Sequence, residues 1–238
     1  MNLVARIAWT LAAAAFFIGC AQTTPSPGAR AAGDEWMDRF PVSKADLKST
    51  GRGTYFILEP GFQMTYEGES DEGDRLVVTV LPETKMIDGV ETRIVEERES
   101  AMGHLTEVSR NYFAIDHRNG DVYYFGEDVD TYKNDKINGH PGSWHSGENG
   151  AHFGLMMPGT ARVGQKFYQE LSPKTAMDRV EIVSTSEIVK TPAGEFKNCV
   201  KTKETTPLER GTVEHKLYAP GVGLIVDGEL KLAKYGGQ

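Results

Sequence analysis

Cysteine is scarce in this sequence, since only Cys20 and Cys199 occur among 238 residues. Two cysteines cannot build the disulfide framework on which many small exported domains depend. Basic residues are also in short supply, with 26 Lys and Arg against 34 Asp and Glu and a formal net charge of −8. Nucleic-acid binding needs clustered positive charge, so we expect no nucleic acid among the partners of this chain.

Several catalytic signatures are missing as well. The chain contains no Gly-x-Ser-x-Gly nucleophile elbow, no phosphate-binding loop and no dinucleotide fingerprint. Glu214 and His215 are adjacent, and neighbours in a strand face opposite ways, so they do not form an acid–base pair with each other. The sequence therefore favours a protein that is not an enzyme. Hydrolysis of envelope polymers ranks third among the hypotheses, and a buried pair of carboxylates in a cleft would favour it.

Long hydrophobic runs are limited to the N-terminus. The run over residues 7–18 follows the single charge of Arg6 and is interrupted only by Thr10. A run of this length is too short to cross about 30 Å of hydrocarbon as a helix. It predicts a secretory signal peptide over residues 1–19, with no transmembrane helix.

The residues Phe17-Ile18-Gly19-Cys20 close this run. A small residue directly before a cysteine resembles the lipobox of bacterial lipoproteins, although Phe17 replaces the usual Leu. The resemblance implies lipidation of Cys20, and two or three acyl chains anchor a protein stably to a membrane. Ala21, and not Asp, follows the cysteine, which resembles the pattern sorted to the periplasmic face of the outer membrane. The alternative is an ordinary cleaved signal with an incidental cysteine.

The next segment predicts a flexible linker over residues 20–45. Its first part is rich in Pro, Ser, Thr, Gly and Ala and has nothing to build a core. Residues 34–40 predict a short helical turn, and Trp36, Met37 and Phe40 are expected to dock on the domain that follows. We assign residues 46–238 to a single domain, which is long enough for a proper core.

Short runs with a period of two recur throughout this domain and are separated by turn residues such as Asp88-Gly89, Asn119-Gly120 and Pro220-Gly221. Such runs indicate antiparallel strands. We predict an all-β fold, an antiparallel and strongly curved sheet closed as a half-barrel, barrel or sandwich, with a short N-terminal helical turn and a long Gly-rich loop. The predicted strands cover residues 56–58, 62–66, 75–81, 90–95, 106–114, 121–125, 180–189, 195–204, 212–218, 222–226 and 229–235.

The domain also carries the motifs SRNYFAID, YYFGEDVDTY, GLMMPG, TPAGEFKNC and YAPGVGL. As a set they resemble a family of exported bacterial β proteins of unassigned function. The last two are similar to a wider group of periplasmic half-barrels like the lipoprotein-sorting factors. The resemblance implies export and an antiparallel β fold, and it implies no catalytic residue.

Residues 138–159 form the most unusual stretch, with six glycines and no strand pattern. His140, His145, His152 and Glu148 lie within it, and imidazole and carboxylate groups are ligands of zinc or copper. A metal site formed by these four residues is therefore the alternative function. The competing interpretation is an ordered loop whose histidines form local hydrogen bonds.

Aromatic residues cluster from Tyr112 to Trp144. Tyr112, Tyr124, Tyr132 and Trp144 are candidates to line the concave face of a curved sheet and bind an apolar ligand. Strand aromatics more often fill a core.

Cys199 also has two interpretations. It is either a reactive thiol between Lys197 and Lys201, or a small buried side chain, and we favour the second.

The leading hypothesis is a lipid-anchored, non-enzymatic protein of the cell envelope. It would bind a partner protein or a hydrophobic, lipid-like ligand.

Overall fold

A computed structural model describes residues 35–68 and 73–237 of the chain. The predicted signal peptide, Cys20 and most of the predicted linker lie outside the described residues.

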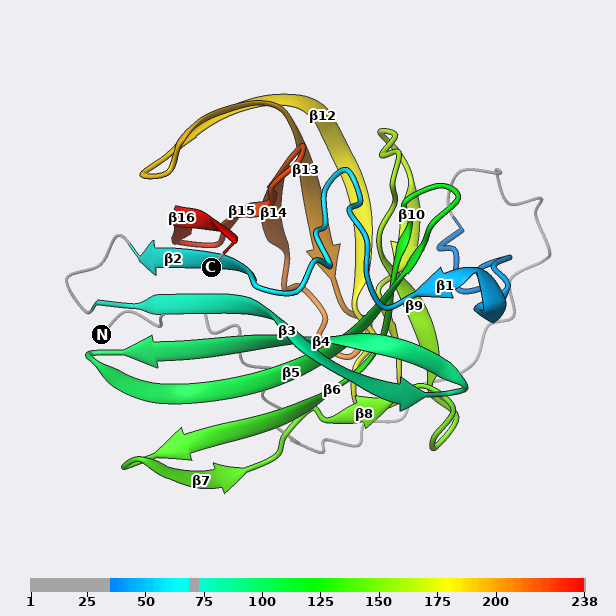
Figure 1. Ribbon diagram of the computed structural model, residues 1–238, viewed down its shortest axis with the longest axis horizontal. Helices are drawn as coiled ribbons and strands as arrows, with labels where there is room; N and C mark the ends of the chain where they lie inside the picture. The colour runs from blue at the N-terminus through cyan, green and yellow to red at the C-terminus, as the bar shows by residue number, and fades with distance from the viewer. Residues whose placement is uncertain (1–34, 69–72, 238) are drawn as a thin grey trace, which may run out of the picture.

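Antiparallel strands dominate the structure, in the order β10-β12-β13-β14-β15-β16-β2-β3-β4-β5-β6-β9-β11 along one continuous sheet, with β1 added to β5 and both β7 and β8 added to β6 (Figure 1). The predicted all-β, strongly curved antiparallel fold is confirmed. The strands are β1 (Leu47–Lys48), β2 (Phe62–Gly68), β3 (Arg75–Ile87), β4 (Val90–Ala101), β5 (His104–Asp116), β6 (Val122–Lys133), β7 (Lys136–Gly139), β8 (Trp144–His145), β9 (His152–Met157), β10 (Lys166–Tyr168), β11 (Glu170–Leu171), β12 (Arg179–Thr191), β13 (Gly194–Thr205), β14 (Glu214–Ala219), β15 (Gly223–Asp227) and β16 (Leu230–Gly237).

Tight hairpins connect most of these strands. Asp88 and Gly89 both have positive φ, 49° and 76°, and join β3 to β4 directly after the Ile87–Val90 pair. Two residues with φ above zero form the turn whose twist suits a two-residue hairpin, and Asp-Gly is a preferred sequence for it. The period-two runs and their turn residues thus correctly predicted this part of the topology.

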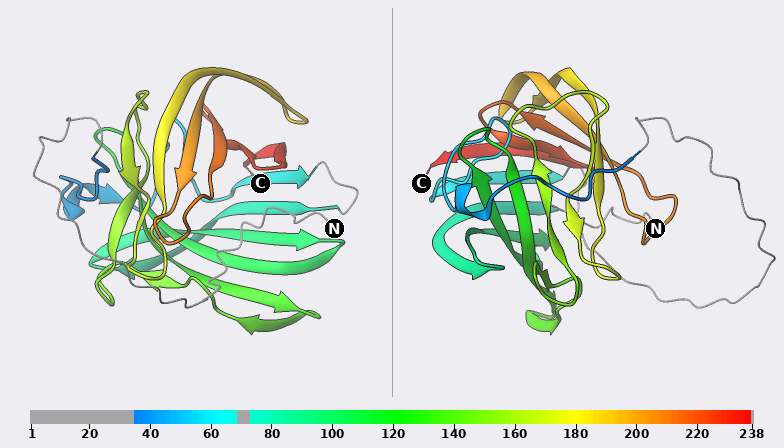
Figure 2. Two further views of the ribbon diagram at one scale, coloured as in Figure 1. Left: turned by 180° about the vertical axis from the view of Figure 1, so that it is seen from behind. Right: turned by 90° about the vertical axis from the view of Figure 1, so that its right-hand side faces the viewer.

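The sheet curls until its two ends almost meet. The views in Figure 2 show β12–β14 facing β3–β6 across the molecule. At the seam, the backbone amides of Gln169 and Glu170, at β11, both donate to the carbonyl oxygen of Asp178, just before β12, at 2.8 and 3.2 Å. Strand β10, at one end of the sheet, also lies against β9 near the other end. The result is a nearly closed barrel.

The Gly-rich stretch is more regular than its sequence indicates. Strands β8 and β9 and the end of β7 fall within residues 138–159, and all three strands pair with β6. Glycines permit this pairing because the backbones come very close: a Cβ on Gly126 would lie 2.1 Å from the carbonyl oxygen of Trp144. Because glycine has no side chain, these strands carry no alternation of apolar and polar residues, and the sequence pattern did not reveal them.

The N-terminal turn is also displaced from its predicted position. Residues 35–43 form no helix, and a 3₁₀ turn spans Lys44–Asp46 instead. The predicted docking is confirmed for two aromatic side chains. Trp36 packs on Tyr168 at 6.3 Å between ring centroids, and Phe40 packs on Tyr123 at 5.8 Å. Among the described residues, no helix is long and apolar enough to cross a membrane.

Candidate functional site

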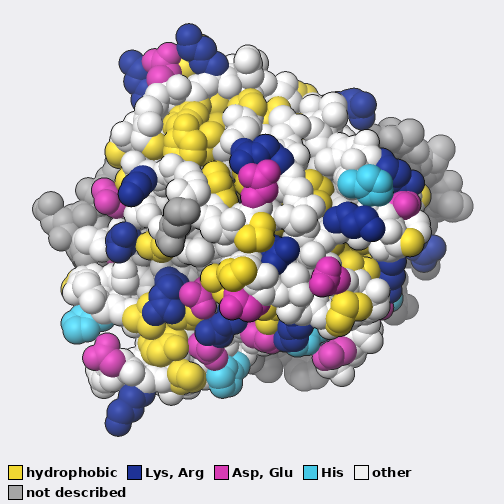
Figure 3. Space-filling model, viewed as in Figure 1, with side chains coloured by type: hydrophobic (Ala, Val, Ile, Leu, Met, Phe, Trp, Pro, Cys, Tyr) yellow, Lys and Arg dark blue, Asp and Glu magenta, His cyan; other side chains and the backbone are white. Residues whose placement is uncertain are grey.

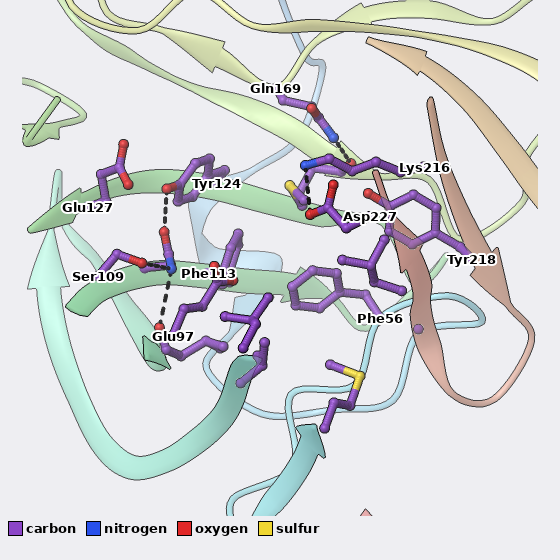
Figure 4. Close-up of a pocket in the computed structure, with 18 of the residues that line it drawn as sticks. Phe56, Glu97, Ser109, Phe113, Tyr124, Glu127, Gln169, Lys216, Tyr218 and Asp227 are labelled. Atoms are coloured by element: carbon purple, nitrogen blue, oxygen red, sulfur yellow. Dashed lines mark hydrogen bonds and ion pairs between the residues drawn. The ribbon is translucent and has the colours of Figure 1, made fainter. Parts of the chain in front are cut away.

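A cavity of about 120 Å³ lies inside the barrel (Figure 4). Including its mouth, the space free of protein atoms is about 1050 Å³. The first of these volumes compares with roughly 10–15 Å³ for a single water, so the cavity has room for a small organic group. Strands from both sides of the barrel contribute to the wall.

One part of the wall is apolar. Phe113 and Tyr124, which are cross-strand neighbours on β5 and β6, stack with ring centroids 4.7 Å apart, and Phe56 lies 4.8 Å from Phe113. Further apolar lining comes from Ile57, Met64, Leu76, Val78, Val80, Val95, Met156 and Leu224. Together these side chains form a surface suited to a ring or an alkyl chain.

The other part of the wall is acidic, and the alternation of the strands explains the change. Inward positions on β5 run from Phe113 through Asn111 and Ser109 to Glu107, and on β4 they run from Val95 to Glu97. Because every second residue of a strand faces the same side, each strand carries the lining from apolar to acidic along its length. The cavity is therefore polarised from end to end.

Seven carboxyl groups line this cavity: Glu97, Glu107, Glu127, Glu170, Asp178, Glu204 and Asp227. Among the described residues of the lining, Lys216 is the one basic side chain. Its Nζ lies 3.3 Å from Glu204 and 3.5 Å from Asp227, and Figure 4 shows it pointing toward Asp227. On the outer face in Figure 3, by contrast, acidic and basic side chains are interspersed.

Glu127, Glu170 and Asp178 form a group of their own, which we call the carboxylate triad. Each has one oxygen without a hydrogen-bond partner in the described structure. Glu127 is 4% exposed and Glu170 is 2% exposed. The hydroxyl of Tyr218, which also lines the cavity, is likewise unpartnered. Buried polar atoms are normally hydrogen-bonded, so these four atoms mark a place where a ligand or water is needed.

The fold brings the carboxylate triad together from three segments. Glu127 belongs to β6, which pairs with β9, and β9 pairs with β11, where Glu170 lies opposite Phe153. A Cβ on Gly154 would lie 2.1 Å from the carbonyl oxygen of Gln169, so glycine is required for β9 and β11 to approach. The backbone bonds to Asp178 described above then hold the third carboxylate beside Glu170.

Burial raises the pKa of most of these carboxyl groups, because it penalises the charged form. The pKa of Glu97 and that of Asp178 each rise to about 7, and that of Glu127 rises to about 8. The pKa of Glu170 rises well above its ordinary value through burial and then through the charges of Glu127 and Asp178. Burial acts in the opposite sense on Lys216, but Asp227 and Glu204 outweigh it and hold its pKa well above the usual range. The cavity thus has an excess of acid that its single lysine does not offset.

One of the four predicted aromatic residues lines the cavity. Tyr124 does, and Trp144 packs behind it in the core, at 5.5 Å and nearly edge-on. Tyr112 faces the opposite side of the sheet, where its hydroxyl donates to Asp128, and Tyr132, near the end of β6, is half-buried and outside the lining. A register irregularity between Asn111 and Phe113 accompanies this arrangement, and Phe113, not Tyr112, faces the cavity beside Tyr124.

The four predicted metal ligands do not converge. His140 Nδ1 lies 2.8 Å from Asp130, whereas His145 Nε2 lies 2.9 Å from Asp128 and its Nδ1 is 3.6 Å from Glu148. His152 is exposed. Within residues 35–68 and 73–237, no group of three or more His, Cys, Asp or Glu side chains is arranged to hold a metal ion.

The two cysteines differ in what the structure describes. Cys20, the predicted lipidation site, lies outside the described residues. Cys199 is buried, and burial raises the pKa of its thiol, so the prediction of a small buried side chain is confirmed. Asn198 has a φ of 56°, and Cys199 and Val200 are both buried, so the strand is irregular at this point and the thiol does not lie on an exposed lysine face.

The acidic lining went unrecognised in the sequence. The signal was present in the inward series Glu107, Ser109, Asn111 and Phe113, which is polar at one end and aromatic at the other. An amphipathic strand with acids on one face is normally exposed to water, and only barrel closure turns that face inward.

Comparisons with protein-family models, curated proteins and solved structures found no match to this chain.

Proposed function

We propose that this chain is a binding protein whose barrel cavity takes a small hydrophobic or amphipathic ligand. The observation that carries the proposal is the polarised cavity, with stacked Phe113 and Tyr124 in its apolar part and unpartnered polar atoms in the other. Ligand sites are typically concave, largely apolar and equipped with a few converging polar groups. A barrel filled solidly by side chains would have argued against ligand binding, and this one is not filled.

The proposal also includes the cellular location of the protein. The lipobox-like Phe17-Ile18-Gly19-Cys20 supports export, lipidation of Cys20 and attachment at the periplasmic face of the outer membrane. In this setting the domain would bind its ligand close to the membrane. Intact mass spectrometry of protein purified from its native membrane tests the anchor: a chain beginning at Cys20 with acyl chains attached supports it, and an unmodified Cys20 contradicts it.

Ligand binding is tested with a neutral apolar dye, N-phenyl-1-naphthylamine, whose fluorescence increases on leaving water. The protein should enhance the fluorescence in a saturable way. Leu224→Trp, which adds a bulky ring to the cavity wall, should abolish the enhancement. Ile188→Trp is the matched control, since Ile188 is 65% exposed on β12. Equal enhancement by both variants would contradict binding in the cavity.

Enzymatic chemistry is a second candidate, because buried carboxyl groups do converge in a cavity. Acid–base catalysis by a carboxyl pair needs one group held protonated and a second held ionised at the same pH. In the carboxylate triad burial raises all three pKa values, and no basic side chain of the lining contacts any of the three to hold it ionised. This common direction favours binding. Turnover of envelope polysaccharides, lost in Glu127→Gln, would reverse the ranking.

A further inference from the structure

The carboxylate triad gives the cavity a chemical preference that an apolar pocket alone would not have. We infer that its ligand carries a positively charged nitrogen, an ammonium or guanidinium group attached to an apolar body, and that Glu127, Glu170 and Asp178 bind this cationic head. The inference rests on the proposed ligand-binding function and narrows it to one class of ligand.

The first argument is hydrogen bonding. The unpartnered oxygens of Glu127, Glu170 and Asp178 are acceptors when ionised, and an ammonium group supplies three donors. The unpartnered Tyr218 hydroxyl adds a further polar contact in the same cavity. A neutral alcohol supplies a single donor, and a carboxylate supplies none. An ammonium or guanidinium group therefore offers these unpartnered oxygens more donors than a neutral or anionic head group does.

The second argument is charge. Lys216 lies against Glu204 and Asp227, which leaves Glu97, Glu107 and the carboxylate triad with no basic side chain of the lining in contact. A buried charge is stabilised only when it is paired, so a cationic ligand would complete this cavity. An anionic head group would add to the excess of acid.

The third argument is the wall beside the carboxylate triad. Tyr124 and Met156 line the same cavity, and Tyr124 stacks on Phe113. Aromatic faces attract organic cations, and they also bury the carbon atoms attached to the charged nitrogen. A hydrated metal ion would gain nothing from such a wall, and the described residues include no group arranged to hold one.

Three ligands of matched size separate the alternatives: 4-phenylbutylamine, 4-phenyl-1-butanol and 4-phenylbutyrate. Binding to the purified full-length protein is measured at pH 8 by titration calorimetry or ligand-detected NMR. A charge-assisted hydrogen bond contributes more than a neutral one, so the amine should bind at least about tenfold more tightly than the alcohol, and the carboxylate should bind most weakly. Glu127→Gln combined with Glu170→Gln should remove the preference for the amine without weakening the alcohol. Glu209→Gln, at an exposed residue, is the control.

The outcomes distinguish this inference from the function on which it rests. Equal binding of all three ligands, or tighter binding of the carboxylate, would overturn the cationic preference and leave the ligand-binding function intact. No binding of any of the three, together with no dye enhancement, would overturn both. A measurement on the unmodified protein gives an independent check. Lowering the pH from 8 to 5 protonates Asp178 and the ionised fraction of Glu127, and it should reduce the amine's advantage over the alcohol. A constant advantage would contradict the inference.

Discussion

Replacing Glu127 by Gln should stabilise the protein at alkaline pH, although most substitutions of buried residues destabilise. The pKa of Glu127 rises from an ordinary value near 4.5 to about 8 in the folded protein, through burial first and then through the neighbouring acids. Because the folded pKa lies above the unfolded one, the free energy of unfolding is highest below about pH 4.5. It falls as the pH rises toward 8. Gln has the same shape and cannot ionise.

The expected size follows from the shift. One pKa unit corresponds to 1.36 kcal/mol, so a rise from 4.5 to 8 costs up to about 4 kcal/mol of stability at pH 8. The gain in Glu127→Gln should be smaller, about 2 kcal/mol, because local relaxation and entering water reduce the penalty of a buried charge. For a domain of this size, that gain corresponds to a rise in Tm of about 4–8 °C.

Thermal and urea unfolding of both proteins at pH 5 and at pH 8 tests this reasoning. The variant should match the unmodified protein or be slightly less stable at pH 5, and it should be more stable at pH 8. Glu209→Gln, at an exposed position, should show no such pH dependence. Equal destabilisation by Glu127→Gln at both pH values would refute the claim that this carboxyl group is buried without a compensating cation.

Three further outcomes are expected. Lys216→Met should lower the free energy of unfolding by about 3 kcal/mol at pH 8 in urea titrations, because it leaves two buried acids unpaired; an unchanged midpoint would show that they are paired elsewhere. Gly154→Ala should lower the free energy of unfolding by about 1–3 kcal/mol or more in the same assay, because the added Cβ would overlap a backbone oxygen. Gly139→Ala is the control and should be nearly neutral, since its Cβ would have its nearest neighbour 3.8 Å away. In a Cys20→Ser background, the thiol of Cys199 should react with a disulfide reagent slowly in the native protein and quickly in denaturant, since it is buried and its pKa is raised; fast native labelling would contradict the burial.

Local patterns in the sequence were sufficient for most strands of the sheet, although not for β7 to β11. The period-two runs around β2 to β6 and β12 to β16 lie where strands form, because a half-buried strand must alternate its side chains. The Asp88-Gly89 turn was equally readable, because it depends on two residues and their φ angles alone. The acidic composition and the lipobox-like Cys20 are likewise properties of the sequence itself.

The cavity, in contrast, was decided by tertiary structure. Tyr112 and Tyr124 were both candidates to line it, but only Tyr124 does. The neighbour of Tyr124 across the strands is Phe113, and Tyr112 faces the other side of the sheet. Which face of an irregular strand points inward depends on its pairing with the next strand, and alternation along one chain segment does not record it.

The carboxylate triad shows the same limit over a longer range. Glu127, Glu170 and Asp178 come from three segments that meet only because β6 pairs with β9, β9 pairs with β11, and the barrel nearly closes beside them. Each residue alone has the sequence environment of an ordinary surface acid. The sequence determined where most strands form, because alternation depends on neighbouring residues. Closure of the barrel determined which acids are buried together, because burial depends on contacts between residues far apart in the chain.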